Sequence, residues 1–252
     1  MRKNSLVIAA TLVLASTSVF ADKDHSKSNN CGTVLKAIGG HANLETKLID
    51  ARNANNGGFD LNMWGTVVSD DGTVCAVVKT GDDINDQWLG SRVISAQKAN
   101  TANAFSLQNS LALSTANLWT ATQPGGSLFG LQFSNPVDTK VAYRGNSKNF
   151  GAKNDPMVGK KIGGVNVFGG GLALYDDEQN MIGAIGVSGD SSCADHNIAW
   201  RTRTALGLDN VPTGVSVNGD DNIIYDPANG FAHPVCTAES QAIAEAFPKA
   251  GE

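Results

Sequence analysis

Runs of apolar residues with strand-like composition occur in two parts of the chain. Residues 61–68 and 73–79 flank the sequence Ser69-Asp70-Asp71-Gly72. An Asp-Gly pair between two β-forming runs is typical of a β-hairpin. Three further strand-like runs cover residues 165–168, 172–175 and 181–188. The pattern therefore predicts five strands.

Other segments repeat their apolar residues at three- and four-residue steps, as amphipathic helices do. These helices are expected over residues 33–53, 91–106, 194–206 and 238–247. Gly39-Gly40 interrupts the first of them, and Thr237 is placed to cap the last. Strands in two groups with helices between and after them predict an α+β fold in a single domain.

The pattern of the N-terminal segment predicts a secretory signal peptide. Arg2 and Lys3 precede an apolar run over residues 6–15, and cleavage is expected after Ala21. Ten helical residues span roughly 15 Å, half of a ~30 Å hydrocarbon core, so a retained anchor is the less favoured alternative. We therefore expect a secreted or periplasmic protein. After removal of residues 1–21, no membrane span is expected.

Charge and composition narrow the classes of function. The 252-residue chain carries a formal net charge of -5 and is 41% hydrophobic. A disordered chain would be less apolar, and a nucleic-acid partner would require a basic surface. We therefore expect a folded protein that does not bind nucleic acid.

The four cysteines, Cys31, Cys75, Cys193 and Cys236, suggest two disulfides in an exported protein. Three pairings are possible, and no CxxC spacing indicates a zinc or redox motif. We expect Cys31–Cys75, because the first helix should pack on the strand that contains Cys75. Cys193–Cys236 would then anchor the C-terminal end.

Two features near residue 190 are candidates for chemistry. Gly189-Asp190-Ser191 resembles the nucleophile stretch of some hydrolases, but no GxSxG motif is present and His41 is a poorly placed base. A polar turn is the favoured interpretation. His196 follows Asp195 at an expected helix start, where it is either an acid/base or metal-binding group or a cap neighbour. We expect Asp195 to raise the pKa of His196.

Three stretches together resemble the GlcG/HbpS family, also called haem-degrading or DUF336 proteins. They are SAQKANTANAF (95–105), GGVNVFGGGLALYD (163–176) and MIGAIGVSGDSSCADHNIAW (181–200). The resemblance covers about residues 61–208. It divides the chain into a leader with the N-terminal helix (22–60), a GlcG/HbpS-like domain (61–208) and a C-terminal extension (209–252).

The resemblance implies an antiparallel sheet of about five strands flanked by helices, in proteins that form homo-oligomers. It also implies haem as a non-covalent cofactor. Because a threonine has been proposed as the iron ligand in some members, Thr101 is the corresponding candidate. Many members have Asp-Glu where this chain has Asp195-His196, so His196 is the alternative iron ligand. The alanine-rich helix around Ala99 is expected to pack against a second copy.

The favoured hypothesis is an exported haem-binding protein. Its ligand-binding residues would be Lys98, Thr101, Ser188, Asp195 and His196, with Lys98 paired to a ligand carboxylate. One alternative is a periplasmic enzyme acting on a small organic acid or aldehyde, with His196 and Asp195 as acid and base. Another is a structural or sensor partner protein without a ligand of its own.

Overall fold

The structure is a computed structural model that describes residues 30–252. The predicted signal peptide lies outside these residues. The helices are α1 (Asn30–Ala37), α2 (Gly40–Asn53), α3 (Ser91–Ala104), α4 (Trp119–Thr122), α5 (Leu131–Ser134), α6 (Thr139–Ala142), α7 (Ser192–Ala205) and α8 (Ala238–Glu245). The strands are β1 (Trp64–Ser69), β2 (Val74–Lys79), β3 (Gly171–Tyr175) and β4 (Met181–Ser188). Short 3-10 turns occur at Thr115–Leu118 and Ser147–Asn149.

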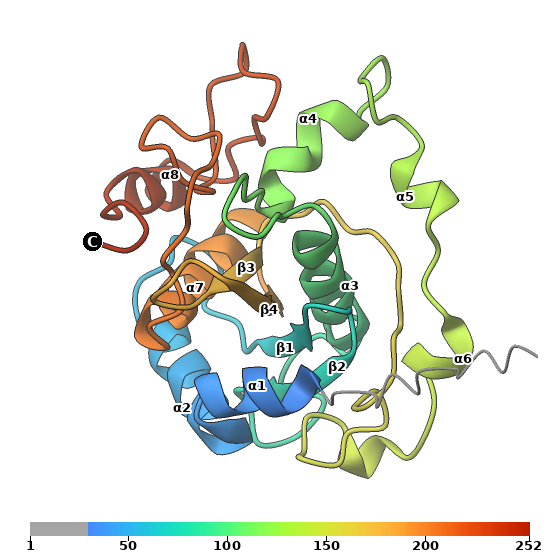
Figure 1. The fold of residues 1–252 in the computed structure, drawn as a ribbon. Coiled ribbons are helices and arrows are strands. Elements are labelled where there is room, and N and C mark those ends of the chain that lie inside the picture. The colour runs from blue at the N-terminus through green and yellow to red at the C-terminus, as the bar shows by residue number, and fades with distance from the viewer. Residues whose placement is uncertain (1–29) are drawn as a thin grey trace, which may run out of the picture.

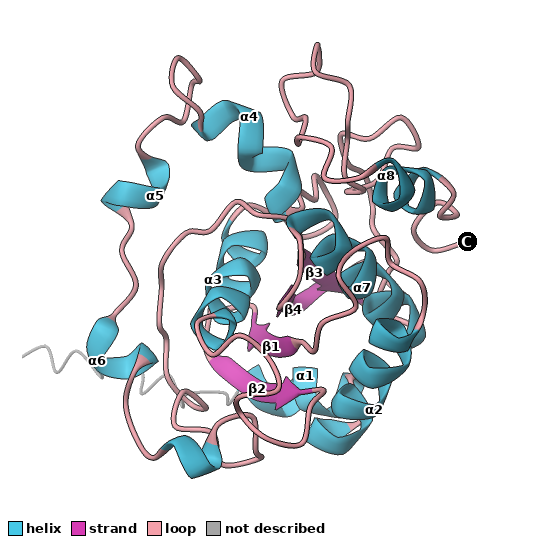
Figure 2. Ribbon diagram, turned by 180° about the vertical axis from the view of Figure 1, so that it is seen from behind, coloured by secondary structure: helices cyan, strands magenta, loops and turns pink. Residues whose placement is uncertain are grey.

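The four strands form one antiparallel sheet in the order β2-β1-β4-β3. Helix α3 covers one face, whereas α1, α2 and α7 cover the other (Figures 1 and 2). Because both faces are covered, every residue of β1 is buried. Sequence analysis correctly predicted the α+β class and the β1–β2 hairpin.

The prediction of five strands was wrong, because residues 165–168 form a loop. Side chains form hydrogen bonds with backbone groups that a strand would pair with a neighbouring strand. Thr101 accepts a hydrogen bond from the backbone N–H of Asn166, and Thr115 donates one to the backbone oxygen of Phe168. The loop therefore passes beside α3 without joining the sheet.

Helix α3 packs unusually close to the sheet. A Cβ atom on Gly186 of β4 would lie 1.9 Å from the backbone oxygen of Ser95, so only glycine fits this position. On α3 the small residues Ala96, Ala99 and Ala102 are fully buried. The alanine-rich face therefore packs inside the chain, and it is not available for contact with a second copy.

Two disulfides connect distant segments. Cys31–Cys75 joins α1 to β2, and Cys193–Cys236 joins the start of α7 to the C-terminal extension. Both expected pairings are therefore present. Between α3 and β3, residues 105–170 form a long arm that carries α4, α5 and α6 around the α3 side (Figure 1).

Candidate functional site

The N-terminal end of α7 brings together most of the polar groups singled out by sequence. Strand β4 ends at Ser188, a tight turn follows, and Ser191 caps the helix by accepting a hydrogen bond from the backbone N–H of Ala194. This confirms the polar-turn interpretation of Gly189-Asp190-Ser191. Ser188 itself is buried at the end of the strand.

Lys98 and Asp195 form a buried ion pair beneath this turn. Lys98 is 1% exposed, and its Nζ lies 2.7 Å from Asp195 Oδ2 and 2.9 Å from the backbone oxygen of Val187. Asp195 Oδ1 accepts hydrogen bonds from the backbone N–H groups of Gly189 and Asp190. Burial raises the pKa of Asp195 to about 6 and lowers the pKa of Lys98. The pair thus joins α3 to the β4–α7 turn.

His196 lies under the C-terminal extension and is 0% exposed. Its Nε2 is 3.2 Å from Asn222 Oδ1 and 3.2 Å from the backbone nitrogen of Ile223, while Nδ1 has no hydrogen-bond partner among the described residues. Burial lowers the pKa of His196 to about 3. The expectation that Asp195 raises this pKa was wrong, because Asp195 bonds to Lys98 and the turn.

Thr101 is also fully buried. Its hydroxyl donates to the backbone oxygen of Gln97 at 2.7 Å and accepts from the backbone N–H of Asn166 at 3.0 Å. In this conformation neither Thr101 nor His196 offers a ligand atom that haem iron can reach. The two predicted iron ligands therefore do not fit a bound haem unless the covering segments move.

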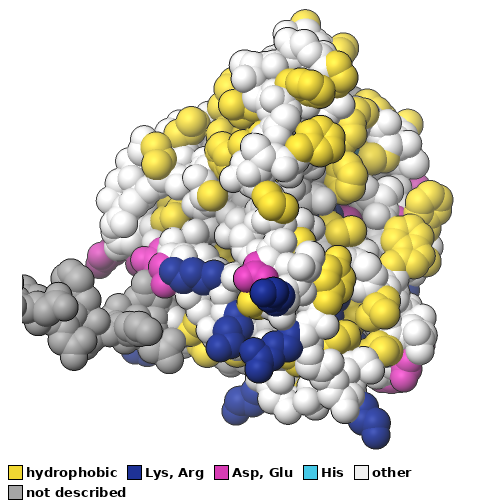
Figure 3. All heavy atoms as spheres, turned by 90° about the vertical axis from the view of Figure 1, so that its right-hand side faces the viewer, with side chains coloured by type: hydrophobic (Ala, Val, Ile, Leu, Met, Phe, Trp, Pro, Cys, Tyr) yellow, Lys and Arg dark blue, Asp and Glu magenta, His cyan; other side chains and the backbone are white. Residues whose placement is uncertain are grey.

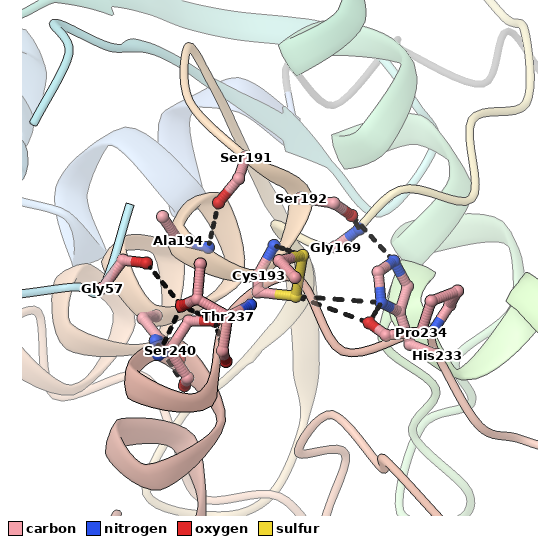
Figure 4. Close-up of a disulfide and its surroundings, with 12 residues drawn as sticks. Gly57, Gly169, Ser191, Ser192, Cys193, Ala194, His233, Pro234, Thr237 and Ser240 are labelled. Carbon is pink, nitrogen blue, oxygen red and sulfur yellow. Dashed lines mark hydrogen bonds between the residues drawn. A yellow bond between two sulfur atoms is a disulfide. The ribbon is translucent and has the colours of Figure 1, made fainter. Parts of the chain in front are cut away.

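A second group of residues, which sequence analysis did not single out as a site, lies between the start of α7 and the C-terminal extension (Figure 4). Ser192, the first residue of α7, has its Oγ 2.8 Å from Nε2 of His233 in the C-terminal extension. The backbone N–H of Gly169 donates to the same Oγ at 2.7 Å. Nδ1 of His233 lies 2.7 Å from the backbone oxygen of Pro234.

An apolar cleft of about 410 Å³ adjoins the His233 ring. Its lining residues are Trp119, Thr120, Tyr225, Pro227, Ala232, His233, Pro234 and Val235. The ring of Trp119 lies 5.2 Å from that of His233 and 5.9 Å from that of Phe168, centroid to centroid. The arm and the extension therefore meet here and form a mostly apolar, aromatic recess beside α7.

Cys193, His233 and Cys236 place possible metal-ligand atoms within 4.8 Å of one another. Both sulfur atoms belong to the disulfide, so these three residues do not form a metal site in the oxidised protein. The disulfide instead positions the segment that contains His233.

Residues 47–203 match the model of a protein family named HbpS-like. The description of that family is "Haem degrading protein HbpS-like". The chain belongs to the HbpS-like family. The matched region contains the sheet, α3 and all but the last two residues of α7, whereas His233 lies outside it. No curated protein matches the chain.

Two solved structures resemble this HbpS-like chain, each at 23% identity. A Klebsiella pneumoniae protein, ORFY of DUF336, has a TM-score of 0.43, and the match covers 68% of this chain and 88% of that one. A PduOC:haem complex has a TM-score of 0.45, with 68% and 95% covered.

Proposed function

We propose that this protein binds haem non-covalently and that the aromatic cleft beside Trp119 receives the macrocycle. Membership of the HbpS-like family is the observation that supports haem binding, whereas most of the cleft lies outside the matched residues and is proposed from the nature of its walls. Apolar and aromatic walls are typical of pockets for flat organic ligands. The Trp119 ring and the exposed side chain of Val235 supply such walls.

The predicted ligand set of Lys98, Thr101, Ser188, Asp195 and His196 remains a second, more demanding binding mode. Iron could reach His196 only if the extension around Asn222 moved away from α7. We favour the cleft because its walls are already in place.

We also propose that the protein works in an oxidising compartment, secreted or periplasmic. Two disulfides and no free cysteine among the described residues support this location. None of the described helices is both long enough and apolar enough to cross a membrane.

Titration of the purified protein with haemin, followed by its Soret band, tests the binding. We expect a saturable spectral shift, and at least tenfold weaker binding for Val235→Asp, because the variant places a charge on an apolar wall. Val217→Asp is the matched control, since Val217 is fully exposed and lies outside the cleft.

The outcomes separate haem binding from its location. No saturable shift in the wild type would refute haem binding. A normal shift with equal affinity in Val235→Asp would leave haem binding intact but refute the cleft. His196→Ala, checked for folding by circular dichroism, then tests the buried binding mode.

A further inference from the structure

We propose that Ser192 and His233 form a nucleophile–base pair that cleaves small carboxylic esters whose apolar group occupies the cleft beside Trp119. This activity goes beyond haem binding and does not depend on it. Sequence analysis set aside Gly189-Asp190-Ser191 because no GxSxG motif is present and His41 is a poorly placed base. The structure supplies a base to the adjacent serine from 41 residues further along the chain.

The contact between the two side chains has the geometry that this chemistry requires. Ser192 Oγ and His233 Nε2 are 2.8 Å apart, within the range for proton transfer from a serine to a histidine. The backbone N–H of Gly169 donates to Ser192 Oγ at 2.7 Å. With this donor in place, the hydroxyl proton is directed at Nε2.

The protonation state of His233 follows from its other nitrogen. The backbone oxygen of Pro234 only accepts, so Nδ1 carries the proton and Nε2 has a free lone pair. This carbonyl plays the orienting part that a carboxylate plays in a Ser-His-Asp triad. Burial lowers the pKa of His233 to about 4, which keeps the ring neutral at pH 7.

The surroundings suit an acyl-transfer site. Ser192 is half-buried, so a ligand in solvent can reach it. It is also the first residue of α7, so an oxyanion formed at Ser192 would lie beside the positive end of the helix dipole. The N–H groups of Cys193 and Ala194 already donate to Cys236 Sγ and Ser191 Oγ, so the dipole rather than free N–H groups would stabilise the oxyanion. The cleft that borders the His233 ring provides room for an apolar group.

The reaction needs only the ester and water. Ser192 Oγ attacks the carbonyl carbon and its proton moves to His233 Nε2. The ester C–O bond breaks, and the leaving alkoxide takes the proton from His233. Water then attacks the acyl-Ser192 ester with His233 again as base, which releases the carboxylic acid and restores the serine.

The Cys193–Cys236 disulfide holds the pair together. Cys193 follows Ser192 directly, and Cys236 lies three residues after His233. The backbone N–H of Cys193 also donates to Cys236 Sγ at 3.2 Å. The covalent link therefore fixes the extension at the point where the base meets the nucleophile (Figure 4).

A fluorophosphonate probe tests the proposal directly, because an activated serine displaces its fluoride and forms a stable adduct. We expect mass spectrometry to find one adduct on Ser192 in the full chain, together with hydrolysis of p-nitrophenyl butyrate. The rate of adduct formation and the rate of ester hydrolysis should each fall at least 100-fold in Ser192→Ala and in His233→Gln. Ser134→Ala, an exposed serine on α5, is the control and should match the wild type.

Three results would overturn the proposal. They are no adduct at millimolar probe, an adduct on a different residue, or an unchanged labelling rate in a folded His233→Gln variant. The last result would mean that the Ser192–His233 bond only fastens the extension. If His233→Gln does not fold, the wild-type adduct and its pH dependence still decide the question. None of these results affects the haemin titration.

Discussion

At the scale of single residues, His233 determines how the proposed activity depends on pH. Its base function requires the neutral ring, and burial lowers its pKa to about 4, although the Pro234 bond acts in the opposite direction. Activity should therefore be full above pH 6 and fall as the pH drops through about 4. An unperturbed histidine would lose activity near pH 6.5.

The pH dependence is measured as the rate of fluorophosphonate labelling between pH 3 and 8. Circular dichroism at each pH is the control, because the buried His196 also has a lowered pKa and would be protonated on acid unfolding. Half-maximal labelling near pH 6.5 in folded protein would contradict the assigned environment of His233.

The sequence predicted a candidate site around the β4–α7 turn, but its local pattern did not indicate how deeply each side chain is buried. Lys98 and His196 occupy positions that the family resemblance marks, yet neither reaches solvent. The local sequence pattern does not reveal that the C-terminal extension covers α7. His233 was missed for the same reason, although the expected Cys193–Cys236 disulfide already implied that it lies near Ser192.

At the scale of elements, sequence analysis predicted turns and helices correctly where the backbone hydrogen bonds are local in the chain. The hairpin of β1 and β2 and the break at Gly39-Gly40 are examples. Residues 165–168 have the composition of a strand, but side chains of distant residues bond to their backbone. Such long-range partners leave no signature in the local sequence.

The extension is fastened to α7 by a buried ion pair as well as by the disulfide. Arg203 Nη1 and Nη2 bond to the two Asp221 oxygens at 2.7 and 2.8 Å, and both side chains are fully buried. We expect Asp221→Asn to lower the free energy of unfolding by about 3–5 kcal/mol, because it leaves the Arg203 charge buried and unpaired.

Chemical denaturation monitored by circular dichroism measures this change. Arg203→Met/Asp221→Leu removes both charges and should recover most of the loss. Lys161→Ala is the control, since its exposed pair with Asp71 should contribute at most about 1 kcal/mol. Equal stability of Asp221→Asn and Lys161→Ala would show that the ion pair does not hold the extension.

At the scale of the whole molecule, the family match over residues 47–203 includes the arm, whereas the C-terminal extension lies beyond it. The arm over residues 105–170 and the extension over 209–252 meet at the cleft, so both proposed activities depend on their contact. The family resemblance covers the arm but ends before the extension, so it contained no information about this contact. Both disulfides join elements of the matched region to other segments.

The outer face of the arm is the surface that we expect to mediate homo-oligomer formation. The exposed aromatic side chains Phe129, Phe133 and Tyr143 lie on it, and Phe133 is 82% exposed. Figure 3 shows apolar side chains over this side of the molecule, with Lys and Arg gathered below them. Six basic residues and one acidic residue, Asp155, occur in 140–161, although the whole chain has a net charge of -5.

Asp155 is buried and bonds to Arg92, so the surface of this segment is strongly basic. Burial of the aromatic rings against a second copy would stabilise the contact. We expect light scattering at micromolar concentration to give a multiple of the monomer mass. Phe133→Asp should shift it toward the monomer without changing the circular dichroism spectrum, whereas Val217→Asp should not. A monomer mass for the wild type, or an unchanged oligomer in Phe133→Asp, would exclude this face as the interface.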